Sequence, residues 1–202
     1  MRTLLLLSLV ASSVARADGS VTASAPEKLK PVPDGGIYFG VGGGLAPDVG
    51  NAGYLTGSLA IDRPLFWRLG LWLTGEWTYL WRAPEPDFAL RLCFGVRIDV
   101  ARSESRRFRA IADLAFAHQH EASVSTWRAH PFESLLGESQ YGLGHRSGIE
   151  GGFGLLVTPW IDSRNWLARR TRILIRVSAQ WMPDDNGPHF FLAAYSSIGL
   201  AL

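Results

Sequence analysis

The 202-residue chain has one cysteine, two lysines and, beyond its first 17 residues, no long apolar run. A lone cysteine, Cys93, cannot form an internal disulfide, and we expect it to pack as a small apolar residue. A helix needs about 18 apolar residues to cross a membrane, so any crossing after residue 17 must use strands. Both lysines, Lys28 and Lys30, lie near the N-terminus, and the arginines are dispersed without a recognition motif. This distribution argues against nucleic acid as a partner.

The first 17 residues have the three parts of a secretory signal peptide. Arg2 supplies the basic region, residues 4–14 the apolar region, and Ala15-Arg16-Ala17 the cleavage site. Removal of residues 1–17 would lower the formal net charge from +2 to zero, because two arginines leave and every acidic residue stays. Residues 18–36 are rich in Ser, Ala and Pro, and we predict a flexible periplasmic tether there. Residues 37–202 then form a single domain.

From residue 37 onward, apolar residues alternate with small or polar ones, which is the pattern of half-buried strands. We predict eight strands, at 37–45, 54–61, 68–81, 88–100, 108–118, 140–157, 171–181 and 189–202. An even number of strands returns the C-terminus to the side of the N-terminus. The links 47–53, 82–87, 119–139 and 182–188 then lie outside, and 62–67, 101–107 and 158–170 face the periplasm. The predicted fold class is all-β, an eight-stranded antiparallel up-and-down transmembrane barrel.

The chemistry of the two faces distinguishes a membrane barrel from a soluble one. Strand 68–81 has Leu71 and Trp77 on one face and Gly70 and Glu76 on the other. Small residues suit the interior of an eight-stranded barrel, whereas a solvated outer face would be dense in Lys and Glu. Aromatic residues gather near both strand ends, as membrane interfaces select. These are Trp77, Tyr79, Trp81, Phe88, Phe116, Trp181 and Phe190 toward the outside, and Phe66, Trp67, Phe108 and Trp160 toward the periplasm.

With this pattern the chain resembles the small outer-membrane barrels of the OmpA/OmpX kind, grouped with opacity-type proteins. The resemblance covers nearly all of the chain after residue 17. It implies insertion into a Gram-negative outer membrane by the barrel-assembly machinery, contact with lipid and lipopolysaccharide, no cofactor and no enzymatic activity. Members of this group typically end in an aromatic residue. Here Ile198, Leu200 and Leu202 keep the alternation, but the last residue is Leu.

Charged residues recur on the inward face, where an unpaired ion is costly. They are Glu76, Arg91, Arg97, Asp99, Arg109, Asp113, Arg146, Glu150, Arg172 and Arg176. Folding strands 88–100 and 108–118 about residues 103–105 places Asp99 opposite Arg109 and Arg97 diagonal to Asp113. Glu150 should likewise meet Arg176. We predict an ion-pair network across the lumen, which either fills the interior or forms a charged path for ions.

Two groups of residues suggest other chemistry. His145, Ser147 and Glu150 are similar to the His-x-Ser arrangement of the lipid A deacylase barrels, which implies an ester hydrolase. However, Gly148 replaces that family's Asn, and Glu150 faces inward, so a triad is not expected to assemble. His118 and His120 share a face and could bind a metal with His130, but the remaining spacing is irregular. We therefore predict no catalytic residues and no metal site.

The long outer link, 119–139, is the main functional candidate. Loops longer than about 12–15 residues in compact domains are usually functional or disordered. This one contains Trp127, Arg128, His130 and Phe132, which could form a docking surface, a lid over the barrel mouth or a segment folded against the rim. The sequence favours a non-enzymatic, surface-exposed structural or interaction protein. A narrow channel and a lipid A-modifying hydrolase remain alternatives.

Overall fold

The computed structural model describes residues 31–47, 52–81, 85–137, 143–184 and 187–202, without side-chain detail at 184–189. The predicted signal peptide and most of the predicted tether, residues 18–30, lie outside the described residues. Among the described residues, no helix has the length and apolar character that a membrane-spanning helix requires.

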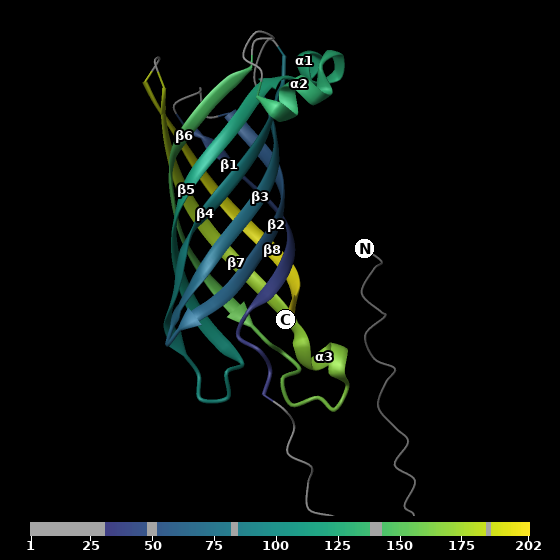
Figure 1. The fold of residues 1–202 in the computed structure, drawn as a ribbon, viewed down its shortest axis with the longest axis vertical. Helices are drawn as coiled ribbons and strands as arrows, with labels where there is room; N and C mark the ends of the chain where they lie inside the picture. The colour runs from purple at the N-terminus through teal and green to yellow at the C-terminus, as the bar shows by residue number, and fades with distance from the viewer. Residues whose placement is uncertain (1–30, 48–51, 82–84, 138–142, 185–186) are drawn as a thin grey trace, which may run out of the picture. The chain divides into compact units, whose positions relative to one another are not determined.

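Eight antiparallel strands form a closed barrel in chain order, and β8 pairs with β1 (Figure 1). The predicted fold is therefore confirmed. The strands are β1 (Gly36–Ala46), β2 (Ala52–Phe66), β3 (Leu69–Leu80), β4 (Asp87–Arg102), β5 (Phe108–Ser123), β6 (Gly144–Val157), β7 (Thr171–Asp184) and β8 (Gly187–Ala201). In the described part of the chain, three short helices accompany them: α1 (Val124–Ala129), α2 (Pro131–Leu136) and α3 (Trp166–Arg170).

The two faces of the barrel differ as the alternation predicts. On β4, Leu92, Phe94 and Val96 are exposed on the outer surface, while Arg91, Cys93 and Arg97, which have the opposite parity, are buried in the lumen. Large apolar side chains are exposed around the whole barrel, including Phe39 on β1 and Ile198 on β8. The buried interior is polar and charged to an extent unusual for a protein core.

Several strands are longer than the sequence predicts. β2 continues to Phe66 and so includes most of the predicted periplasmic link 62–67. Only Trp67 and Arg68 form the turn before β3. Trp67 has a left-handed backbone conformation with φ of 50°, as tight hairpin turns require. β5 also extends five residues beyond its predicted end. The outer link is correspondingly shorter than predicted and is partly helical.

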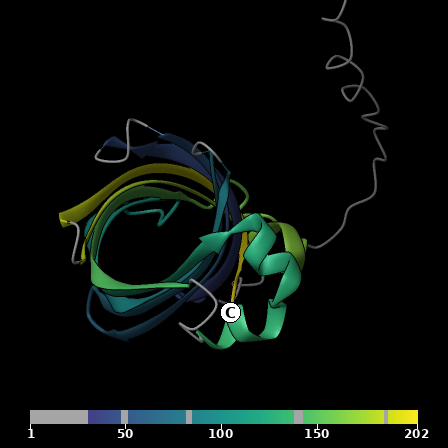
Figure 2. The ribbon, with the colours of Figure 1, turned by 90° about the horizontal axis from the view of Figure 1, so that it is seen from above.

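The helices mark the two ends of the barrel. α1 and α2 follow β5 at one end, and α3 and the C-terminus lie at the other (Figure 1). Viewed along the barrel, α1 and α2 lie beside the ring of strands and not across its mouth (Figure 2). Of the three alternatives for this segment, the described part fits a position against the rim, because α1 and α2 contact the barrel wall at β4 and β5.

A closed barrel whose strands bond on both edges should resist sodium dodecyl sulfate until it is heated. We expect the purified chain to migrate faster on a denaturing gel when it is loaded unheated than after boiling. Equal mobility in both lanes, from protein whose circular dichroism is rich in β-structure, would contradict the closed barrel.

Candidate functional site

The ten inward charges that the sequence predicts all lie on the lumen side. Nine of them are buried, and Arg146 is half-buried. Every one of these ten residues has at least one oppositely charged partner or a set of hydrogen bonds. The lumen therefore holds connected groups of ions, which we describe as an upper, a central and a lower cluster.

The central cluster is built around Arg176 on β7. Its guanidinium contacts the carboxylates of Asp113 on β5 and Glu150 on β6, with Nε donating to Asp113 Oδ2 at 3.0 Å. Gln180 also donates to Glu150. The Cys93 thiol lies 3.5 Å from the same carboxylate and is fully buried, consistent with a packing role. One arginine thus links three consecutive strands, β5, β6 and β7.

The upper cluster lies toward the end that carries α1 and α2. Arg91 Nη1 donates to Glu76 Oε2 at 2.8 Å, and the Tyr195 hydroxyl donates to the same oxygen at 3.1 Å. Arg91 Nε also donates to the Gln119 side chain, whose amide nitrogen donates to Glu121 at 2.6 Å. Glu121 in turn pairs with Arg146 at 3.3 Å. The chain of contacts links β3 to β6 and β8.

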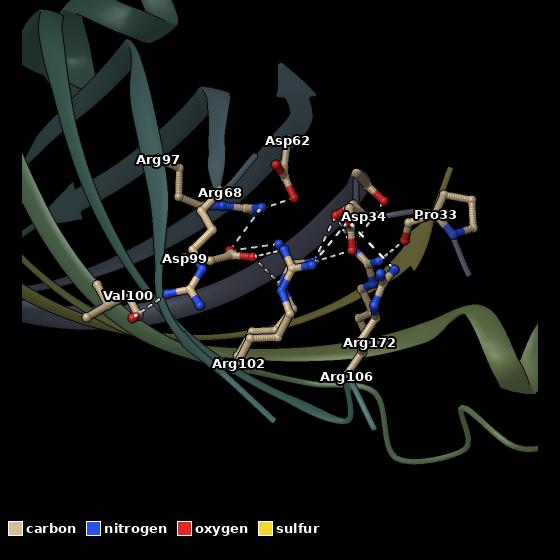
Figure 3. A network of polar contacts seen from close by, with 12 residues as sticks. Pro33, Asp34, Asp62, Arg68, Arg97, Asp99, Val100, Arg102, Arg106 and Arg172 are labelled. Atoms are coloured by element: carbon tan, nitrogen blue, oxygen red, sulfur yellow. Dashed lines mark hydrogen bonds and ion pairs between the residues drawn. The ribbon is translucent and has the colours of Figure 1, made fainter. Parts of the chain in front are cut away.

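The lower cluster lies near the opposite mouth (Figure 3). Arg109 donates two hydrogen bonds to the Asp99 carboxylate, from Nε to Oδ2 at 3.0 Å and from Nη2 to Oδ1 at 2.8 Å. Arg102 contacts Asp99 too, and Arg97 pairs with Asp62 on β2. Bidentate arginine–carboxylate pairs are among the stronger polar contacts in proteins. Glu121 and Asp62 belong to the network, although the sequence did not single them out.

Residues 33–35, which precede β1, contact this lower cluster through their backbone. Arg172 Nη1 donates to the backbone oxygens of Asp34 and Gly35 at 2.8 and 3.0 Å, and its Nη2 contacts that of Pro33. Arg109 also donates to the Asp34 carbonyl at 3.0 Å. Residues 33–35 were predicted to belong to a flexible tether, and that boundary is wrong, because buried arginines hold their backbone.

Aromatic rings fill the space between the ion clusters. Trp72 and Tyr38 are almost fully buried with ring centroids 6.3 Å apart. The Arg97 and Arg176 guanidiniums lie 6.0 and 5.7 Å from the Trp72 centroid, a distance at which a cation is attracted to the ring. Trp72 is not among the predicted lumen residues, although its parity with Gly70 and Thr74 places it on the inward face.

The register differs in detail from the prediction. A bulge at Val100 shifts the pairing register between β4 and β5. Asp113 therefore lies directly opposite Arg97, and Asp99 lies opposite Ile111. Asp99 and Arg109 still form an ion pair, on a diagonal. Although they are opposite, Arg97 and Asp113 form their closest ion pairs with residues on other strands, Asp62 and Arg176 respectively. Glu150 is directly opposite Gln180 and meets Arg176 because the arginine extends along the lumen.

The histidines of β5 and β6 gather on the outer face near the α1–α2 end. His118 and His120 lie beside His145, and His118 Nδ1 is 2.8 Å from Ser147 Oγ. His130, the predicted third partner, does not join this set. Glu150 is buried on the lumen side with Arg176, so the His145–Ser147–Glu150 triad is not assembled.

The outer-loop candidates fall into two groups. Trp127 is folded against the rim, with its Nε1 donating to the Phe88 carbonyl at 2.8 Å and its ring edge-on to the Phe88 ring. His130 is half-buried between the helices, whereas Arg128 and Phe132 are exposed. Leu135 and Leu136 on α2 are exposed as well, so an apolar face of this helix is uncovered.

Comparisons with known proteins bear on the fold. No family model and no curated protein matches the chain. Two solved structures are similar: the N-terminal β-barrel domain of Pseudomonas aeruginosa OprF and Ail, the attachment invasion locus protein of Yersinia pestis. The OprF domain is 10% identical with a TM-score of 0.42, covering 83% of this chain and all of that one. Ail is 12% identical with a TM-score of 0.43, covering 83% and 95%.

The fold is that of the small eight-stranded outer-membrane barrels. Its eight antiparallel strands close in sequence order, and the exterior of the barrel is apolar. The predicted resemblance is confirmed at that level.

The lower cluster allows a direct test of the energetic role of lumen charges. Asp99→Asn removes the carboxylate that Arg109 and Arg102 share, and breaking a buried pair typically costs about 3–5 kcal/mol. Asp162→Asn is a matched control, because its pair with Arg107 is exposed and should contribute no more than about 1 kcal/mol. Urea unfolding of barrels reconstituted in vesicles measures both. Equal destabilisation by the two substitutions would contradict a structural role for the lumen network.

Proposed function

We propose that the protein is a non-enzymatic barrel of a Gram-negative outer membrane, with a closed, ion-paired interior. In this proposal it acts as a structural or interaction protein, and its α1–α2 segment contacts the outer-leaflet lipid. The observation that carries the proposal is the combination of an apolar exterior with a lumen whose buried ions pair with one another.

The exterior supports the membrane location. Exposed aromatic side chains occur near both ends, with Trp77 and Trp181 toward the α1–α2 end and Phe66 and Trp67 toward the other. Between them the exposed residues are aliphatic or Phe, such as Leu114 and Val177. A soluble monomer rarely exposes a continuous apolar surface of this extent, whereas a membrane barrel requires one.

The interior supports a structural role over a conducting one. Arg176 is neutralised by two carboxylates and lies over Trp72 and Tyr195, which occupy the space beside it. A conducting path needs ions or water that can exchange along it. Arg176 on β7 reaches Trp72 on the opposite strand β3, and an ion passing this point would have to displace side chains that are held in buried pairs.

The outer segment supports lipid contact. Phe132 and Leu136 are each 75% exposed, on a helix that lies beside the barrel wall (Figure 2). Apolar side chains in this position suit the boundary between headgroups and acyl chains. Arg128 is exposed on the neighbouring helix, and arginine is well suited to bind the phosphates of lipopolysaccharide.

Planar bilayer recordings test the closed interior. We expect no discrete conductance steps from the wild-type barrel or from Glu150→Gln, because one lost charge leaves the aromatic filling in place. A heat-dependent gel shift of the same preparations shows that both are folded. Reproducible wild-type steps whose size or ion selectivity changes in Glu150→Gln would instead support the narrow-channel alternative.

Site-specific labels test the lipid contact of α2. Phe132→Cys and Arg128→Cys are each labelled with an environment-sensitive fluorophore and reconstituted in vesicles that contain brominated lipid. We expect quenching at position 132 and little at 128. The unmodified chain, whose Cys93 is fully buried, controls for background labelling. Equal quenching at the two positions, or none at 132, would contradict the contact.

A further inference from the structure

Three histidines lie close together on the outer surface, near the end of β5 and the start of β6. His120 lies directly opposite His145 in the strand register, and His118 lies two residues along β5 on the same face. One ring nitrogen from each lies within 4.8 Å of the other two. Ring centroids are 4.6 Å apart for His120 and His145, and 4.9 Å for His118 and His120. None of these side chains takes part in the lumen network.

Each of the three rings is held by a neighbour through one nitrogen. His120 Nδ1 donates to the Leu135 carbonyl at 3.2 Å, which leaves the lone pair on Nε2. His145 Nε2 donates to the Gly137 carbonyl, which leaves the lone pair on Nδ1. His118 Nδ1 is 2.8 Å from the Ser147 hydroxyl, which can donate or accept and therefore allows either tautomer. This arrangement matches that of metal-binding histidines, in which the second nitrogen bonds to a carbonyl or another polar group.

The ring nitrogens that face one another are already close together. His118 Nε2 and His120 Nε2 are 3.0 Å apart, a hydrogen-bond distance. Because His120 Nδ1 donates to Leu135, His120 Nε2 accepts from His118 Nε2–H in the metal-free protein, and a metal ion would take the place of this proton. Zinc binds imidazole at about 2.0–2.1 Å, which places the ligand atoms of a tetrahedral site about 3.4 Å apart. The ligand atoms of His118, His120 and His145 lie within 4.8 Å of one another, and the first two rings are half-buried while the third is exposed.

We propose that His118, His120 and His145 form a binding site for a divalent transition-metal ion, with Zn²⁺ as the representative ion. Three neutral imidazoles suit zinc, copper or nickel, whereas calcium and magnesium require oxygen ligands. The site supplies three protein ligands and leaves a fourth position for water or an external group. The proposal is independent of the function proposed above.

The site would couple metal binding to the outer segment. The carbonyls of Leu135 and Gly137, at the end of α2, orient two of the three ligands. Gly137 has φ of 82°, and a Cβ at this position would fall 2.8 Å from His120 Cε1. Only glycine therefore allows the chain to approach the rings this closely. A bound ion would fix the end of α2 against the barrel wall.

Isothermal titration of ZnCl₂ into the untagged full chain, refolded in detergent at a pH of about 7.5 where imidazole is neutral, tests the proposal. We expect one saturable ion per chain. His120→Asn should weaken binding at least 100-fold, and Ser147→Ala about 10-fold, within the usual range for a partner that orients a ligand. His130→Asn is the matched control, a histidine of the same region outside the cluster, and should bind as the wild type does. Visible spectra with Co²⁺ should show the strong absorption of four-coordinate cobalt.

The variants alter the outer face and not the lumen, so the heat-dependent gel shift should persist in all of them. Absence of saturable zinc binding by the folded wild type would overturn the proposal. Equal weakening by His130→Asn and His120→Asn would overturn it as well, because binding would then reflect scattered histidines. Neither result would affect the closed-barrel function, which the bilayer recordings test separately.

Discussion

The width of an eight-stranded barrel is the constraint on which the rest of the structure depends. Such a barrel is just wide enough for side chains to fill, and its exterior must be apolar if it faces lipid. The lumen of this protein accordingly holds many buried side chains that contact one another from different strands. Where they are charged, each ion must find its partner inside, because desolvation without pairing costs several kcal/mol per ion. The ion clusters follow from this requirement.

Arginine meets the requirement better than lysine does. Its planar guanidinium presents several donors in fixed directions, so that one residue can join carboxylates on different strands. Arg176 does this at the centre, where it contacts Asp113 and Glu150. At the lower mouth Arg109 pairs with both Asp99 and Asp34, and Arg172 donates to the backbone oxygens of residues 34 and 35. The same residue type stacks on Trp72. The absence of lysine after residue 30 is consistent with this use of the lumen.

Period-two alternation was enough to predict the fold and the inward or outward direction of each strand, because both depend only on local parity. It also placed Asp99 near Arg109. It did not predict the partner of Arg97, because the bulge at Val100 shifts the register and Asp62 lies on a non-adjacent strand. The spacing within β5 indicated two of the three histidines of the cluster, His118 and His120, as possible metal ligands. Its third member comes from β6, and pairing of that strand with β5 cannot be obtained from spacing within one segment.

The most direct test of the central claim, that paired ions hold the lumen together, is a double-mutant cycle on Glu76 and Arg91. These two side chains are almost fully buried and their charged atoms lie 2.8 Å apart. Unfolding free energies of Glu76→Gln, Arg91→Met and the double variant give the coupling between them. We expect each single variant to be strongly destabilised and the double variant to recover at least about 1 kcal/mol relative to additivity. A coupling energy near zero, with both single variants as stable as the wild type, would contradict the account.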